Sequence, residues 1–106
     1  MSRIQMIALA AFMAGSMPTV WAAELTGQQV FDKYCIYCHG ADAEGAGTRQ
    51  LAATRGEDKA VLAERDDLAP EYVRYVVRNG LRAMPPFVPS ELTEQQLEAL
   101  TEFLSP

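Results

Sequence analysis

The sequence Cys35-Ile-Tyr-Cys38-His39 constrains this chain more than any other feature. Two thiols separated by two residues, with an imidazole directly after the second, form the attachment signature of a c-type haem. Each thiol can add to a haem vinyl group to form a thioether, and the histidine then points at the iron. The motif therefore predicts one covalently attached haem c, bound through Cys35 and Cys38, with His39 as an axial ligand.

Two other uses of a Cys-x-x-Cys pair are a zinc site and a thiol-disulfide redox centre. Cys35 and Cys38 are the only cysteines and His39 is the only histidine, whereas a structural zinc site is nearly always closed by four Cys or His ligands. A thioredoxin-like pair expects alternating strands and helices, and the sequence has no convincing run of strands. Haem is favoured, and a thiol oxidoreductase without haem is kept as an alternative.

The first residues have the pattern of an export signal. Arg3 precedes an apolar stretch over residues 4–15, and small residues follow near position 22. We expect a signal peptide over residues 1–22, with cleavage after Ala22 or after Ala23. A retained membrane anchor is disfavoured because the apolar stretch is shorter than the ~20 residues that a spanning helix needs.

Removal of this leader leaves a single small domain over residues 23–106. The formal net charge of −5 becomes −6 when Arg3 is lost, which disfavours nucleic acid as a partner. Haem thioethers on an exported protein go with an oxidising compartment outside the cytoplasm, so we expect a bacterial periplasmic location. A domain of this size buries only about 60% of its unfolded surface, and a haem would supply the missing apolar centre.

Three helices are predicted from their end signals. Residues Thr26 to Gln29 fit a capping box and predict a helix from about Gly27 to Tyr34. A second helix begins at Pro70, which suits a first turn, and ends before Gly80. A second capping box, at residues 93–96, opens a last helix.

The remaining segments are predicted to be mostly loops. Gly40–Thr48 is too rich in glycine for a regular element, and residues 48–67 are charged and ambiguous, with a short helix over 58–64 as a candidate. Residues 84–89 contain three prolines and predict a stiff extended loop. The chain is therefore expected to be all-α, with three to four helices around one haem. The candidate residues for the apolar shell around the haem are Val30, Phe31, Leu51, Val73, Val77, Leu81, Phe87, Leu97, Leu100 and Phe103.

The second axial ligand is predicted to be Met84, the only methionine left once the leader is removed. Its thioether is a soft ligand, and the proline-stiffened loop holds it at low entropic cost. A methionine that only fills a gap in the core is the alternative. Coordination by His39 and Met84 raises the reduction potential and leaves no vacant iron site, which favours electron transfer. An open iron site, as in a haem-based sensor or a peroxidase-like protein, is the competing interpretation.

Several longer motifs resemble one family. They are Gly27-x-x-x-Phe31, the haem motif, the glycine-rich loop, the stretch from Arg78 to Phe87 and Leu100-x-x-Phe103-Leu104. Together they resemble a class I c-type cytochrome over nearly all of residues 23–106. The Arg-Asn-Gly-x-x-x-Met-Pro-x-Phe pattern further resembles the small cytochrome subunits of flavin-dependent dehydrogenases of the p-cresol methylhydroxylase kind.

This resemblance implies a fold and a function. It implies that the first and last helices cross near Gly27 and Phe31, with Leu100 and Phe103 opposite, and that the exposed haem edge is the electron port. It also implies an electron-transfer protein that is not itself an enzyme. Such a protein accepts single electrons from a dehydrogenase, a flavoprotein, and passes them to a downstream carrier or oxidase.

Further expectations concern the side chains near the predicted ligands. Many relatives have a proline where this chain has Thr48, and its carbonyl orients the ligand imidazole; we expect a backbone carbonyl to orient His39 here as well. Asn79 is a candidate hydrogen-bond donor to the Met84 sulfur. Three arginines, Arg74, Arg78 and Arg82, form either a positive rim for a partner or a solvated face on which one arginine serves a haem propionate.

Overall fold

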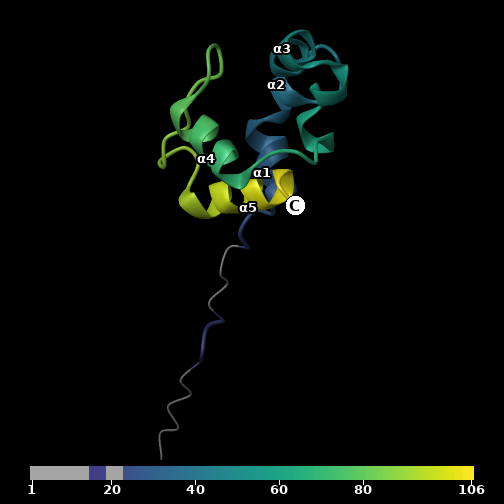
Figure 1. Ribbon diagram of the computed structural model, residues 1–106. Coiled ribbons are helices and arrows are strands. Elements are labelled where there is room, and N and C mark those ends of the chain that lie inside the picture. The colour runs from purple at the N-terminus through teal and green to yellow at the C-terminus, as the bar shows by residue number, and fades with distance from the viewer. Residues whose placement is uncertain (1–14, 19–22) are drawn as a thin grey trace, which may run out of the picture.

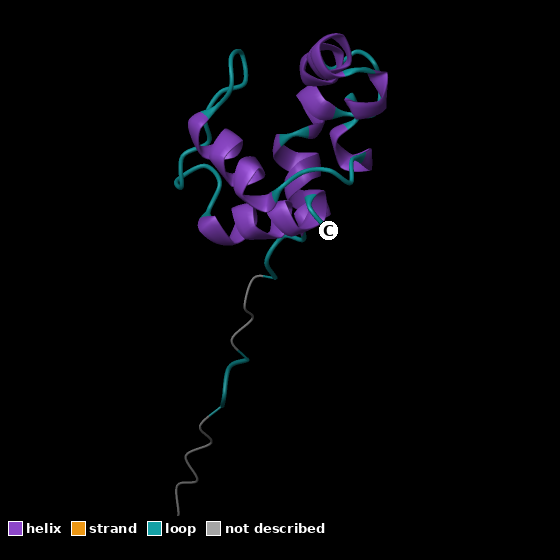
Figure 2. Cartoon of the chain, in the orientation of Figure 1, coloured by secondary structure: helices purple, strands orange, loops and turns teal. Residues whose placement is uncertain are grey.

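The computed structural model describes residues 15–18 and 23–106. The signal peptide predicted over residues 1–22 lies mostly outside the described residues and stays a prediction. Helices joined by loops make up the described part, which contains no strand (Figures 1 and 2). The elements are α1 (Gly27–Tyr34), α2 (Ile36–His39), α3 (Ala46–Arg55), the 3-10 turns η1 (Glu57–Lys59) and η2 (Leu62–Glu64), α4 (Pro70–Asn79) and α5 (Glu94–Leu104). The all-α prediction is confirmed.

Capping boxes fix the beginnings of α1 and α5, as predicted. Thr26 Oγ1 accepts the Gln29 amide at 3.2 Å, and Gln29 Oε1 accepts the Thr26 amide at 2.9 Å. Thr93 and Gln96 repeat this reciprocal pair with the same two distances. Each box satisfies backbone amides that have no partner within the helix, and such a cap stabilises a helix by about 1 kcal/mol.

The crossing of α1 and α5 has the geometry that the family resemblance implied. Gly27 lies so close to α5 that an added Cβ would overlap the Ala99 carbonyl and the Phe103 Cβ. Beside it, the rings of Phe31 and Phe103 lie 5.8 Å apart between centroids, tilted by 52°. Only glycine permits so close a crossing, so this interface is specified by one small residue and one aromatic pair.

A single buried cluster lies between α1, α4, α5 and the segments that join them. Its members are Val30, Phe31, Leu68, Val73, Val77, Leu92, Leu97, Leu100 and Leu104. Phe87 and Phe103 are half-buried against it, and Leu51 is also half-buried. Leu81, predicted to belong to the shell around the haem, is 47% exposed in the turn beyond the end of α4 and lies outside this cluster.

Two predictions between residues 40 and 67 are wrong: the extent of the glycine-rich loop and the short helix that follows it. The loop predicted over Gly40–Thr48 ends early, since α3 begins at Ala46. The short helix predicted over residues 58–64 is instead the pair of 3-10 turns, η1 and η2, on either side of the buried Ala60. Contacts with distant residues, described below, stabilise the first turn of α3 where local propensity does not.

The arrangement leaves two groups of elements apart from each other. Figure 1 shows α4 with its following loop on one side and α2 with α3 on the other, both extending the same way from α1 and α5. The haem motif and the Met84 loop thus belong to different groups. Among the described helices, none is both long and apolar enough to cross a membrane.

Candidate haem-binding site

The haem motif consists of Cys35, which lies between α1 and α2, and the four residues of α2 (Ile36–His39). The Cys35 amide donates to the Phe31 carbonyl at 2.8 Å, which closes α1. The Cys35 carbonyl in turn accepts the amides of Cys38 and His39 at 3.1 and 2.8 Å. One helical turn therefore holds both thiols and the imidazole in a fixed backbone frame, as the spacing of the motif predicts.

The two thiols differ in their surroundings. Both are free, but Cys35 is half-buried against the core cluster whereas Cys38 is exposed. Burial, followed by the nearby Cys38 thiol, raises the pKa of Cys35 to about 12. A raised pKa disfavours the thiolate form, so Cys35 is not suited to be the attacking thiol of a redox pair.

One edge of the His39 imidazole packs against the backbone of α3 at Gly47. A Cβ added to Gly47 would lie 2.5 Å from His39 Cε1 and 2.7 Å from Nδ1, so only glycine leaves room for the ring. Burial lowers the pKa of His39, which keeps the ring neutral, the form that binds a metal. Because Gly47 covers Nδ1, Nε2 is the nitrogen left for a metal.

The expected carbonyl partner of His39 is missing. Nδ1 is buried and has no hydrogen-bond partner among the described residues. The physical reason is that residues 46–48 are helical: the Gly45 carbonyl accepts the Arg49 amide at 3.0 Å, and the next carbonyls point along the axis of α3. Because Nδ1 has no partner in the described structure, packing against α3, and not a hydrogen bond at this nitrogen, holds the His39 ring in place.

Thr48 anchors α3 to the haem motif through its side chain rather than its backbone. The side chain is 3% exposed, and its hydroxyl donates to the Gly40 carbonyl at 2.7 Å, with the Cys38 carbonyl at 3.4 Å. These carbonyls lie on either side of His39 in the sequence. The sequence predicts a backbone carbonyl near His39 and not this side-chain bond, for which a hydroxyl so close to the motif was the available signal.

Met84 lies at the end of a tight turn that follows α4. Leu81 and Met84 exchange two backbone hydrogen bonds, of 3.1 and 3.0 Å, and Arg82 in the turn has a φ of 54°. The Met84 side chain is half-buried against the core cluster, the same cluster that Cys35 contacts. One end of the haem motif and the Met84 loop thus meet a common apolar surface.

The polar residues near Met84 are engaged elsewhere. Asn79 Nδ2 donates to the Tyr75 carbonyl of its own helix at 2.8 Å. Arg74 pairs with Glu98, and Arg78 pairs with Glu94, each at 2.6 Å. Carboxylates of α5 therefore neutralise two of the three arginines of the expected rim.

The donor groups fit a c-type haem. Two free thiols one helical turn apart, an imidazole whose pKa is lowered by burial, and a thioether that packs on the same apolar cluster as Cys35 are groups that could tether such a haem and fill its axial positions. Within residues 15–18 and 23–106, no three His, Cys, Asp or Glu side chains gather as a metal site. The donor set is that of a haem protein.

Comparisons with known proteins identify the family of this chain. Residues 22–104 match the family described as cytochrome c oxidase, cbb3-type, subunit III. The cytochrome c subunit of 4-cresol dehydrogenase (hydroxylating) from Pseudomonas putida is 31% identical over 80 residues, which cover 76% of this chain and 58% of that protein. The chain thus spans less than two thirds of the length of this curated relative.

Solved structures give the same result. A crystal structure of p-cresol methylhydroxylase matches with a TM-score of 0.56 at 31% identity, over 76% of this chain and 90% of the matched chain. A second, with substrate bound, matches with the same score and identity over 89% of its chain. The resemblance predicted from the motifs, and the fold it implied, are confirmed in both sequence and structure.

Proposed function

The chain belongs to the cytochrome c family described as cytochrome c oxidase, cbb3-type, subunit III, and from this premise we propose that it is a mono-haem electron carrier of the bacterial periplasm. Membership of the family implies haem binding and electron transfer. The proposal adds export with loss of residues 1–22, and a mature domain over residues 23–106.

In this proposal Cys35 and Cys38 bind one haem c covalently, and His39 and Met84 are the axial ligands. One observation carries it: Cys35, between α1 and α2, and Met84, in the loop that follows α4, contact the same buried cluster. When bound, haem iron supplies reversible one-electron oxidation and reduction. A thioether ligand favours the reduced iron, and two protein ligands leave no position for oxygen or peroxide.

The proposed electron donor is a flavin-dependent dehydrogenase. The support is that the Pseudomonas putida relative is named as the cytochrome c subunit of a cresol dehydrogenase. In this role the chain is an electron-transfer subunit or shuttle and supplies no acid, base or nucleophile. The acceptor in the proposal is a downstream carrier or oxidase.

A mixing experiment tests this function. The oxidised haem-loaded protein is mixed with a flavin-dependent phenol-oxidising dehydrogenase and its substrate, and the haem absorption is followed. We expect reduction of the haem, and we expect the reduced protein to bind carbon monoxide slowly or not at all. A protein that this dehydrogenase does not reduce, and that binds carbon monoxide at ordinary rates, would instead support the sensor or peroxidase-like alternative.

A further inference from the structure

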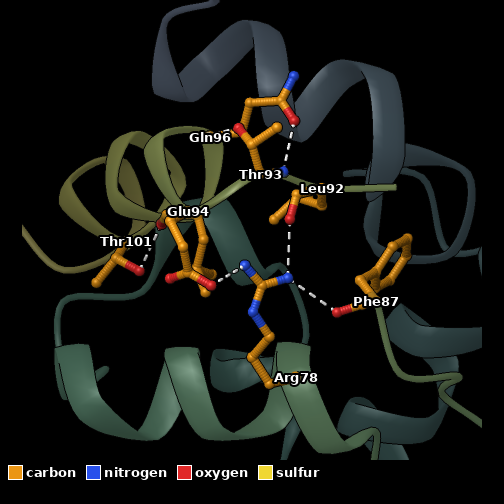
Figure 3. Close-up of polar contacts among 8 residues, drawn as sticks. Arg78, Phe87, Leu92, Thr93, Glu94, Gln96 and Thr101 are labelled. Atoms are coloured by element: carbon orange, nitrogen blue, oxygen red, sulfur yellow. Dashed lines mark hydrogen bonds and ion pairs between the residues drawn. The ribbon is translucent and has the colours of Figure 1, made fainter. Parts of the chain in front are cut away.

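The guanidinium of Arg78 connects the end of α4 to three points beyond it. Nη1 donates to the carbonyl oxygens of Phe87 and Leu92, at 2.9 and 2.8 Å, and Nη2 donates to Glu94 Oε1 at 2.6 Å (Figure 3). The side chain is only 19% exposed, although it carries a permanent charge. A buried guanidinium with this many partners has a structural role that a solvated arginine lacks.

Phe87 is the residue that this contact fixes most tightly. Its amide donates to the Val77 carbonyl at 2.8 Å, and its carbonyl accepts from Arg78, so both its backbone polar groups are bound to α4. Its ring meets the ring of Tyr34 in α1 edge-on, 6.1 Å between centroids at 78°. Phe87 is therefore anchored to two helices.

The position of Phe87 sets the position of Met84, because only Pro85 and Pro86 separate them. Each proline ring fixes its φ and removes a donor, so this short segment has little freedom. Beyond Phe87, the amides of Glu91 and Leu92 bond to the Val88 carbonyl within the segment itself. The bond from Arg78 to the Leu92 carbonyl therefore joins the far end of the segment to α4.

We propose that Arg78 is the positioning residue of the Met84 loop: its bonds to the Phe87 and Leu92 carbonyls hold the loop closed and thereby hold the Met84 thioether in place. The inference rests on the proposed function, in which Met84 is an axial ligand. Lysine cannot replace arginine here, since an ammonium lacks the planar fork that reaches three acceptors at once.

The first test uses Arg78→Lys in the haem-loaded, oxidised protein, titrated with imidazole and followed by absorption. Imidazole takes the place of Met84 only when the loop opens, so its apparent affinity rises with the open fraction. Loss of hydrogen bonds from a charged donor predicts an affinity about tenfold higher or more. An affinity equal to that of the unaltered protein would overturn the proposal.

Two control variants separate the carbonyl bonds from the ion pairs. Arg74→Lys alters an arginine of the same helix that also pairs with α5, through Glu98, and that has no bond to the loop. Glu94→Gln removes the carboxylate from Arg78 but keeps both carbonyl acceptors. We expect imidazole affinities close to the unaltered value for both. An effect of either control as large as that of Arg78→Lys would overturn the proposed role of the carbonyl bonds.

Hydrogen exchange gives a second reading that does not depend on ligand binding. In Arg78→Lys, the amides of Met84 and Phe87 should exchange about tenfold faster. The amide of Val30, which donates to the carbonyl of Thr26 at the N-cap of α1, should exchange at an unchanged rate. Equal acceleration at all three amides would show a general loss of stability and would reject a positioning role.

Met84→Ala distinguishes failure of this inference from failure of the proposed function. If Met84 is a ligand, its removal strengthens imidazole binding beyond the level of Arg78→Lys. If Met84→Ala binds imidazole as the unaltered protein does, the proposed ligand set is wrong. The exchange rates of the Met84 and Phe87 amides in Arg78→Lys still decide the role of Arg78 in that case.

Discussion

Two regions of this molecule differ in how fully they bury their apolar side chains and pair their polar groups. The helical base, formed by α1, α4 and α5, caps both α1 and α5 and buries most of its apolar side chains, although Tyr72 and Tyr75 of α4 are exposed. The ligand segments, residues 35–48 and 80–92, expose large apolar side chains and leave Nδ1 of His39 without a partner in the described structure. The exposed ones are Ile36 at 40%, Tyr37 at 82%, Leu81 at 47% and Val88 at 47%.

The difference teaches which part of the chain depends on its cofactor. Exposed apolar side chains near the predicted ligands suit contact with a large apolar group. We therefore expect the ligand segments to depend on haem more than the helical base does. Four variants test this contrast and a fifth lies outside both regions; they are ordered by the size of the expected effect.

The largest effect is expected from Cys35→Ala combined with Cys38→Ala. Without thioethers, no haem should remain with the chain after denaturation, and staining of a denaturing gel for haem measures this directly. Tyr37→Ala, between the two cysteines and exposed, is the matched control and should retain its haem. Haem that stays on the double variant after denaturation would contradict attachment through these thiols.

The next effect is that of Met84→Ala on the reduction potential. Loss of the thioether removes the ligand that favours reduced iron, so the potential should fall by on the order of a few tenths of a volt. Redox titration of the absorption spectrum measures the shift. Leu81→Ala, in the same turn but with an apolar side chain that cannot bind iron, should change the potential far less. An unchanged potential in Met84→Ala would remove Met84 from the ligand set.

In the helical base the expected effect is on stability and not on the iron. Leu100 is 1% exposed in the core cluster, and Leu100→Ala should lower the free energy of unfolding by about 2–5 kcal/mol. Denaturant unfolding measures the loss, while the absorption spectrum of the folded protein should stay the same. A changed spectrum with unchanged stability would reverse the assignment of the two regions.

Thr48→Val should have a smaller effect, at the junction between α3 and the haem motif. The variant loses the bond to the Gly40 carbonyl and leaves that carbonyl buried, at a cost of about 1 kcal/mol in unfolding free energy. Thr54→Val is the matched control, because Thr54 is in the same helix, is exposed, and bonds only to its own helix at Gln50. Equal losses in both variants would show that the buried bond has no special role.

The smallest effect is expected outside both regions, at Asp67. Hydrogen bonds from Arg65, first, and Lys59 hold the pKa of Asp67 well below its ordinary value of 3.8. A carboxyl with a lowered pKa in the folded state stabilises the protein above pH 3.8, and this stabilisation is lost as the pH falls through the lowered value.

Asp67→Asn should therefore lower the melting temperature slightly at neutral pH, with a difference that shrinks in acid and in high salt. Thermal unfolding across pH measures it, with Asp66→Asn as the neighbouring control. A difference that grows in acid would contradict the assigned direction of the pKa.

Local signals explain why the helical base was predictable. Two capping boxes, at Thr26 and Thr93, and a helix that begins at Pro70 and ends before Gly80 are complete within a few residues of sequence. The structure confirms all three helices. Leu68 and Leu92 were missed because they are buried in segments between helices, where no periodicity marks an inward face.

The misses in the ligand segments have a different cause. The sequence predicts a loop at Gly47 and Thr48 because glycine disfavours helix. In the structure both residues lie in the first turn of α3, which contacts with His39 and Gly40 stabilise. The motif residues were recognisable because their chemistry is contiguous in the sequence. The sequence does not identify Arg78 as an anchor of the Met84 loop, because Arg78 binds backbone carbonyls, which every residue has and which leave no signature in the sequence.

The most direct test of the account is the mass of the chain after maturation in a host that attaches haem c, measured on denatured protein. We predict a coloured polypeptide that begins near residue 23 and is heavier by the mass of one haem, with the added mass on the peptide that contains Cys35 and Cys38. Colourless protein, or haem that separates from the chain on denaturation, would contradict the account.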